Sequence, residues 1–213
     1  MSETAKDFWN NAHENKQIRA LSGHSLDVHV DHMCVRDKLA EAIDVLCVGI
    51  GTGEWINDLL ADYPHLNIDA MDISEEAFKS VPDITCMTPD EFYIWGPINK
   101  YDLVISLWVS PHMTDTELEL QVIGIVQSLT DDGVFALQYS EPIDETDGRL
   151  IEFMHSDTAP ASVMSAGLFC RTATCMSDMI DAAGGKQILT FNGDITDYGM
   201  EREVITHIVR MPT

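Results

Sequence analysis

Basic residues are scarce in this chain. Only 12 of its 213 residues are Lys or Arg, against 36 Asp or Glu, so the formal net charge is −24 at pH 7. Such a charge repels the phosphate backbone of DNA or RNA and the anionic surface of a membrane. We therefore expect neither nucleic acid nor a membrane as a partner.

Long apolar runs and paired cysteine motifs are also missing. The longest apolar runs, residues 45–51 and 103–109, are far shorter than the roughly 20 residues needed to cross a bilayer. The five cysteines include no CxxC pair, and the first residues lack the basic and apolar regions of a secretory signal. These features predict a cytoplasmic protein without a disulfide framework.

Short apolar runs alternate with longer amphipathic segments, and no repeat or flexible linker divides the chain. The alternation predicts a single α/β domain with a doubly wound, largely parallel sheet, whose ligand site lies beyond the carboxyl ends of the strands. Strands are expected at 42–48, 66–71, 84–87, 102–107, 134–139, 187–191 and 204–210. Helices are expected at 52–63, behind Ser74, at 114–129 and at 176–183.

Three alternate glycines, Gly49, Gly51 and Gly53, connect the first expected strand to a helix. Glycines at this place permit a tight turn and a close approach of the backbone to a ligand. Glu54 stands where a dinucleotide-binding motif would have its last glycine, and its carboxylate would repel a pyrophosphate. The motif therefore favours a cofactor without phosphates, and a glycine turn that holds no ligand is the alternative.

Asp72 ends the second expected strand. An acidic side chain there can accept hydrogen bonds from both hydroxyls of an adenosine ribose. Taken alone, such an Asp is also common as a helix cap or a solvated residue. The combination of strand, glycine turn, helix, strand and terminal acid points more specifically to an adenosine-containing cofactor.

Four stretches resemble the class I S-adenosylmethionine-dependent methyltransferases, and the resemblance extends from about residue 40 to the last residue. They are 45–53, 68–74, 101–113 and 131–142. The resemblance implies a Rossmann-like seven-stranded sheet in the order 3-2-1-4-5-7-6, with strand seven antiparallel and helices on both faces. Residues 1–40 would form an N-terminal helical cap on a methyltransferase domain of residues 41–213, and the cofactor would be S-adenosyl-L-methionine.

The resemblance also assigns cofactor contacts. The three glycines would lie against the methionine part, Asp72 would bind the ribose, and Ile73 would line the adenine. Cys47 departs from the family, which usually has an acid at that position. The further candidates for cofactor binding are Thr88 and Asp90 at the adenine edge, Ser106 at the end of strand four, and Arg19 and Trp9 from the N-terminal segment. A helix packed on the sheet, with Arg19 in solvent, is the alternative for that segment.

His112 lies where the family often has a histidine in its substrate-side loop. A histidine, with an unperturbed pKa of about 6.5, suits removal of a proton from a hydroxyl acceptor. A packing residue at the start of a helix is the alternative. The candidates for substrate binding are Trp108, Tyr139 and His155.

Histidines and aspartates gather at residues 23–32. Their spacing does not match known metal sites, so we expect no metal and a solvated histidine-rich helix. The sequence as a whole predicts methyl transfer to a small-molecule or sugar-like acceptor, at oxygen rather than nitrogen, and leaves carbon acceptors open. The alternatives are a non-catalytic cofactor-binding subunit or regulator, and a different use of the cofactor, such as aminopropyl transfer or cofactor cleavage.

Overall fold

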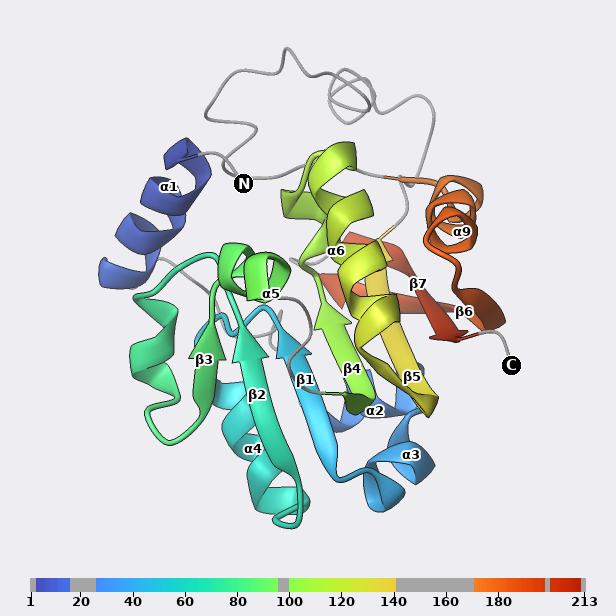
Figure 1. Ribbon diagram of the computed structural model, residues 1–213, viewed down its shortest axis with the longest axis horizontal. Helices are drawn as coiled ribbons and strands as arrows, with labels where there is room; N and C mark the ends of the chain where they lie inside the picture. The colour runs from blue at the N-terminus through green and yellow to red at the C-terminus, as the bar shows by residue number, and fades with distance from the viewer. Residues whose placement is uncertain (1–2, 16–25, 96–99, 141–170, 198–199, 212–213) are drawn as a thin grey trace.

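Seven strands form one sheet in the computed structural model, which describes residues 3–15, 26–95, 100–140, 171–197 and 200–211 (Figure 1). The strand order is β3-β2-β1-β4-β5-β7-β6. Strands β1 to β5 are parallel, whereas β7 is antiparallel to both β5 and β6. The strands are β1 Asp44–Val48, β2 Asn67–Met71, β3 Thr85–Met87, β4 Tyr101–Leu107, β5 Leu129–Ser140, β6 Lys186–Asp197 and β7 Met200–Arg210. The predicted fold class and strand order are confirmed.

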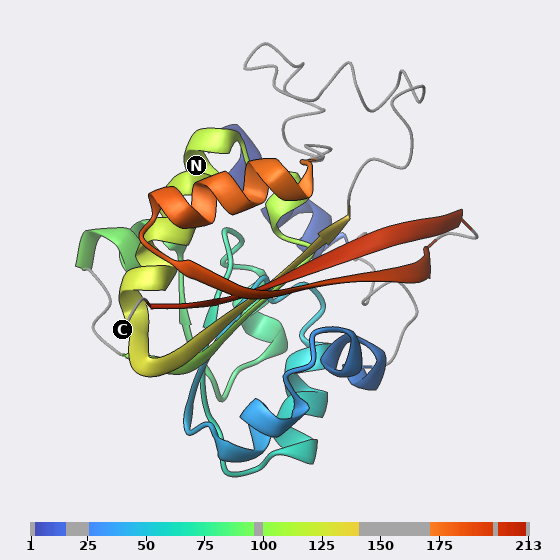
Figure 2. The same ribbon diagram turned by 90° about the vertical axis from the view of Figure 1, so that its right-hand side faces the viewer.

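Helices cover both faces of this sheet, which Figure 2 shows nearly edge-on. One apolar core lies between the sheet and α2, α3 and α4, and a second lies between the sheet and α5, α6 and α9. The α-helices are α1 Glu3–Glu14, α2 Leu26–His32, α3 Arg36–Glu41, α4 Glu54–Asp62, α5 Pro89–Trp95, α6 Asp115–Ser128 and α9 Ala173–Ala182. Two 3-10 turns, η2 Ala77–Ser80 and η3 Ser110–His112, complete the described elements.

Local signals in the sequence set the ends of α6 and α9. Thr114 and Glu117 form a reciprocal capping box at the start of α6, within the segment where a helix is expected. The Thr172 side chain accepts a hydrogen bond from the Cys175 backbone N–H at the start of α9. Gly184 ends α9 with a φ of +79°, a conformation that glycine adopts without strain.

Two expectations about the helices are wrong. The segment behind Ser74 is the single 3-10 turn η2 rather than an α-helix, because the N–H groups of Ala77 and Phe78 donate to the carbonyls three residues before them. The histidine-rich segment is not solvated at His29. That side chain is fully buried, with Nδ1 2.9 Å from Gln138 Oε1 on β5.

The N-terminal helices differ in what they contact. Val30 of α2, Leu39 of α3 and Met33, which lies between the two helices, belong to the apolar core against the sheet. Helix α1 lies instead beside the carboxyl ends of β2 and β3 (Figure 1). No helix in the described part of the chain is both long and apolar enough to cross a membrane.

Candidate functional site

The glycine turn sits between β1 and α4, and its three glycines have different surroundings. All three have positive φ, which disfavours any other residue. A Cβ on Gly49 would come 2.3 Å from Val109 Cγ2, and one on Gly53 would come 2.4 Å from Ser80 Oγ. A Cβ on Gly51 would meet no protein atom within 4 Å. Gly49 and Gly53 therefore serve close packing of the turn, and Gly51 borders open space.

Asp72 closes the same turn from the end of β2. Its Oδ2 accepts hydrogen bonds from the backbone N–H groups of Ile50, at 2.8 Å, and Gly51, at 3.4 Å. Its Oδ1 accepts from the Ser74 backbone N–H at 2.9 Å. Burial raises the pKa of the Asp72 carboxyl above its usual range, and these N–H groups and the nearby His13 offset only part of that rise.

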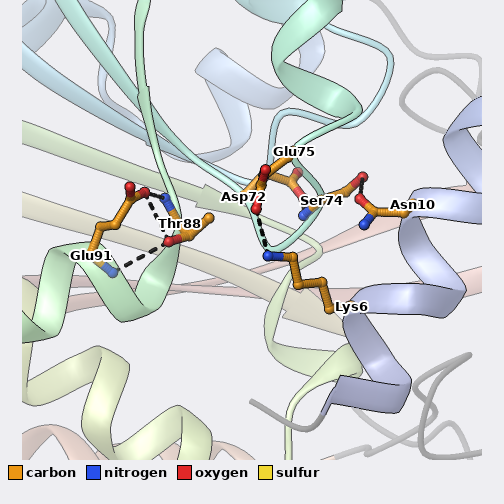
Figure 3. A network of polar contacts seen from close by, with 7 residues as sticks. All are labelled: Lys6, Asn10, Asp72, Ser74, Glu75, Thr88 and Glu91. Atoms are coloured by element: carbon orange, nitrogen blue, oxygen red, sulfur yellow. Dashed lines mark hydrogen bonds and ion pairs between the residues drawn. The ribbon is translucent and has the colours of Figure 1, made fainter.

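Helix α1 contacts the loop that follows Asp72 (Figure 3). The Ser74 hydroxyl donates to Asn10 Oδ1 at 2.8 Å, and Lys6 forms an ion pair with Glu75. His13 interacts electrostatically with Asp72, and burial lowers the pKa of the His13 imidazole. The sequence alone does not indicate these contacts, although Lys6, Asn10 and His13 are spaced so as to share one face of a helix.

The end of β4 carries two buried polar groups without a hydrogen-bond partner in the described structure. Ser106 is fully buried on β4, where it pairs with Val48, and its hydroxyl has no partner. Trp108 follows with a φ of +58°, an unfavourable backbone conformation for a residue of this size, and its buried indole N–H also has no partner. Strained and unsatisfied groups of this kind concentrate at functional sites.

His112 ends the 3-10 turn η3, just beyond Trp108. Its ring contacts Trp9 of α1, with 4.7 Å between the ring centroids and 72° between the planes. Two sequence-predicted residues that are more than a hundred positions apart are thus brought together. Helix α1 therefore contacts both the loop that follows Asp72 and the loop that follows β4.

Arg171 was not among the residues expected from the sequence, and it directly precedes Thr172, the N-cap of α9. Only 2% of its side chain is exposed. Its guanidinium contacts the Asp115 carboxylate and the backbone carbonyls of Ser110 and Met113, which lie on either side of His112 in the sequence. The available signal was composition, because a basic residue next to a helix cap is unusual in so acidic a chain.

Thr88 and Asp90 were expected at the adenine edge, and Thr88 has a local structural role. The Thr88 hydroxyl and backbone N–H both donate to Glu91 Oε2, and the Glu91 N–H returns a bond to the Thr88 oxygen (Figure 3). This capping box starts α5, a helix that sequence analysis did not expect. Asp90 is exposed in the first turn of α5, and Ile73 is partly buried beside Asp72.

The remaining candidates lie elsewhere or outside the described residues. Tyr139 is 1% exposed on β5, and its hydroxyl is 2.8 Å from His207 Nε2 on β7. Burial lowers the pKa of His207 to about 4, so this ring is neutral near pH 7 and can accept the Tyr139 proton in a hydrogen bond. Arg19 and His155 lie outside the described residues.

Cys47, on β1, is fully buried in the core beneath the glycine turn. Burial, together with the nearby Asp69 carboxylate, raises the pKa of the Cys47 thiol. Within the described residues, no group of three His, Cys, Asp or Glu side chains could hold a metal ion.

The fold is that of class I methyltransferases. The chain is similar to an O-methyltransferase family protein from Burkholderia thailandensis, with a TM-score of 0.62, 12% identity, and coverage of 98% of this chain and 60% of that one. It is also similar to a protein studied in the conversion of a disulfide bond into a thioacetal group during echinomycin biosynthesis, with a TM-score of 0.65, 15% identity, and coverage of 97% and 92%.

A third similar structure is the N-methyltransferase NodS from Bradyrhizobium japonicum WM9, with a TM-score of 0.58, 12% identity, and coverage of 91% of this chain and 100% of that one. The chain thus spans about three fifths of the first of these proteins and nearly all of the other two. No protein-family profile and no curated protein sequence matches it. At such low identity the likeness establishes the fold, and activity has to be argued from the site.

Proposed function

We propose that this protein is an S-adenosylmethionine-dependent methyltransferase acting on a small-molecule acceptor, at oxygen. The observation that carries the proposal is the glycine turn with the Asp72 carboxylate bonded beneath it, at the carboxyl end of the parallel strands. This is the place where open α/β sheets bind their ligands. The similarity in fold to O- and N-methyltransferases supports the same activity.

The residues present fit this cofactor. The open space at Gly51 allows a ligand to approach the backbone. A carboxylate offers about four lone-pair positions, and Asp72 uses three, one of them in the long 3.4 Å contact with Gly51. Asp72 can therefore accept one ribose hydroxyl directly, and a second by displacing that weak contact. The buried Ser106 hydroxyl lies on β4, the strand that pairs with β1, and it is a further group to which a ligand could hydrogen-bond.

S-adenosylmethionine, when bound, supplies an electrophilic methyl group on a cationic sulfur. The protein then has to hold the acceptor in line with that methyl group, exclude water and take up the acceptor's proton. We assign proton removal to His112, and its position on the loop beyond β4 and against Trp9 supports this assignment. The oxygen preference rests on this histidine, since a hydroxyl acceptor needs a base more than an amine does.

We infer the class of acceptor and the cellular compartment from the charge and composition of the chain. A net charge of −24 disfavours polyanionic acceptors and is compatible with a neutral or cationic small molecule. Nucleic acid and membranes are not expected as partners on the same grounds. We place the reaction in the cytoplasm, because the cysteines show no disulfide pattern in the sequence.

Transfer of labelled methyl groups to a panel of phenols, hydroxy acids, sugars and amines tests the proposal. In the His112→Ala variant we expect lower turnover of hydroxyl acceptors with nearly unchanged affinity for S-adenosylhomocysteine. The matched control is His65→Ala, which removes an exposed histidine that follows α4 in the sequence. Unchanged turnover in His112→Ala would remove His112 from the role of base, and transfer only to amines would overturn the oxygen preference.

Cys47 favours a second candidate, a protein that binds the cofactor without methylating an acceptor. A neutral buried thiol cannot replace the acid that this position usually carries as a partner for an ammonium group. Binding of S-adenosylhomocysteine without transfer to any acceptor would support this candidate. Mass spectrometry of the products would identify aminopropyl transfer or cofactor cleavage.

A further inference from the structure

The buried guanidinium of Arg171 joins the start of α9 to the loop that carries His112. Its Nε and Nη2 lie 2.8 Å from Asp115 Oδ1 at the start of α6. Its Nη1 donates to the Ser110 carbonyl at 2.9 Å, and its Nη2 donates to the Met113 carbonyl at 2.6 Å. One side chain thus binds the backbone before His112, the backbone after it, and the helix that follows.

Among the described residues, two backbone hydrogen bonds hold the turn that carries His112. The His112 N–H donates to the Val109 carbonyl at 2.9 Å, and the Met113 N–H donates to the Ser110 carbonyl at 3.2 Å. A single 3-10 turn with two such bonds is intrinsically weak. Ser110 and Met113 are themselves buried, so without Arg171 their carbonyls would lose a charged donor and gain little water in exchange.

The geometry requires an arginine rather than any cation. A guanidinium presents its N–H groups in a rigid planar fork, which can bind a carboxylate on one side and carbonyls on the other. A lysine ammonium is a single point of charge on a flexible stem, so it cannot reach all three acceptors at once.

We propose that Arg171 is a positioning residue for His112. It fixes the turn η3 so that the imidazole is held at one place relative to the acceptor, and it does not itself touch the reacting atoms. This inference rests on the proposed role of His112 as the base. Because the contacts of Arg171 are with the backbone around His112 and not with the glycine turn, its loss should affect turnover rather than cofactor binding.

The test compares Arg171→Lys with the unaltered protein and with Arg36→Lys. Arg36 is a suitable control because it forms an exposed ion pair with Asp31 on another face of the molecule. We expect Arg171→Lys to lower kcat about 10- to 100-fold, because small misplacements of a catalytic group have effects of that size. The affinity for S-adenosylhomocysteine should remain within about twofold, the limb of the pH–rate profile assigned to His112 should shift, and Arg36→Lys should change none of these.

Arg171→Ala provides a second measurement if its melting temperature shows that it folds. Guanidinium ion at millimolar concentration should restore part of its turnover by occupying the vacated site, and it should not affect Arg36→Ala. Unchanged kcat in Arg171→Lys would overturn the proposal. An equal loss of kcat and cofactor affinity, without a change in the pH profile, would also overturn it, since that pattern indicates general destabilisation.

A readout that needs no methyl transfer keeps this inference separate from the proposed function. The imidazole NMR signal of His112, assigned by its absence in His112→Ala, should titrate at a shifted pH in Arg171→Lys and at the original pH in Arg36→Lys. If the unaltered protein transfers no methyl group, the proposed function fails and this titration alone decides on Arg171. An unchanged titration would then contradict the positioning role.

Discussion

The indole of Trp9 lies edge-on against the imidazole of His112, with ring centroids 4.7 Å apart. The contact connects α1 to the loop that follows β4, and the Asn10–Ser74 hydrogen bond connects the same helix to the loop that follows β2. A single helix therefore covers both the cofactor-side and the acceptor-side loops of the proposed site. Its effect on catalysis can be tested at the aromatic contact.

Replacing Trp9 by alanine should lower kcat/KM for the acceptor by about 2- to 13-fold, because aromatic pairs contribute about 0.5–1.5 kcal/mol beyond the area they bury. Trp9→Phe should recover most of the loss, since it keeps a ring against His112. Steady-state kinetics of the two variants make the comparison. Equal kcat/KM in Trp9→Ala and the unaltered protein would show that the contact has no catalytic role.

Cofactor binding should weaken on acidification, and at a higher pH than an ordinary aspartate would cause. Ribose hydroxyls need the lone pairs of an ionised carboxylate, and burial raises the pKa of Asp72 in the folded protein. As the pH falls through this raised pKa, Asp72 takes up a proton and loses acceptor capacity. Calorimetric titration of S-adenosylhomocysteine across pH should show the decline.

Asp72→Asn should weaken this binding at neutral pH and flatten its dependence on pH. Asp58→Asn, at an exposed position on α4, is the matched control and should leave both unchanged. Unfolding measured without ligand shows how much of the effect comes from the backbone bonds that Asp72 makes to the glycine turn. A binding affinity that is constant with pH in the unaltered protein would contradict the role of Asp72.

Two glycines of the turn should respond differently to substitution by alanine. Gly49→Ala combines two costs, because alanine disfavours the left-handed backbone conformation and its Cβ would clash with Val109. Together they should lower the free energy of unfolding by about 2–5 kcal/mol. Gly51→Ala has room for its Cβ and should cost only about 1–2 kcal/mol. The Gly51 variant should remain folded and yet bind S-adenosylhomocysteine at least tenfold more weakly. Normal binding by folded Gly51→Ala would show that the open space is not the cofactor site.

Asp102 should stabilise the opposite end of the sheet in a pH-dependent way. Burial raises the pKa of its carboxyl, but hydrogen bonds from the Ile43 and Asp44 N–H groups and the Thr130 hydroxyl, with the Lys38 charge, outweigh burial and lower the pKa overall. A lowered folded pKa contributes stability above the unfolded value of about 3.9, and that stability is lost as the pH falls toward the folded pKa.

Denaturant unfolding at pH 7 and pH 3 tests this expectation. Asp102→Asn should lower the free energy of unfolding by about 1–3 kcal/mol at pH 7, since it removes charged hydrogen bonds. This deficit relative to the unaltered protein should shrink at pH 3. Asp83→Asn, at an exposed position, should show no comparable deficit at either pH. A deficit of Asp102→Asn that is equal at both pH values would contradict the account.

The fold was predictable because its signals are local and repeated. Buried runs such as 45–48 and 103–107 carry the periodicity of parallel strands, and the Thr114–Glu117 cap and Gly184 mark helix ends without any tertiary information. The 3-10 turn η2 was not predictable in the same way. A serine followed by acids predicts the N-cap of a helix, but the Ser74 hydroxyl donates to Asn10 of α1, a long-range contact that the local sequence does not show.

The site was predictable only where one motif carries the chemistry. The glycine turn and Asp72 are visible in the sequence, whereas the distinction between Gly51 and its neighbours depends on Val109 and Ser80, which lie far along the chain. The role of Arg171 depends on three acceptors from a loop and a helix more than fifty residues away. Long-range contacts of that kind leave no periodic signal.

The central claim is that the glycine turn and Asp72 bind the adenosine cofactor, and calorimetric titration of the unaltered protein with S-adenosylhomocysteine at neutral pH tests it most directly. We predict saturable binding with one molecule per chain, which is lost or strongly weakened in Asp72→Asn and retained in Asp58→Asn. Absence of binding to the unaltered protein, or equal binding by Asp72→Asn, would contradict the claim.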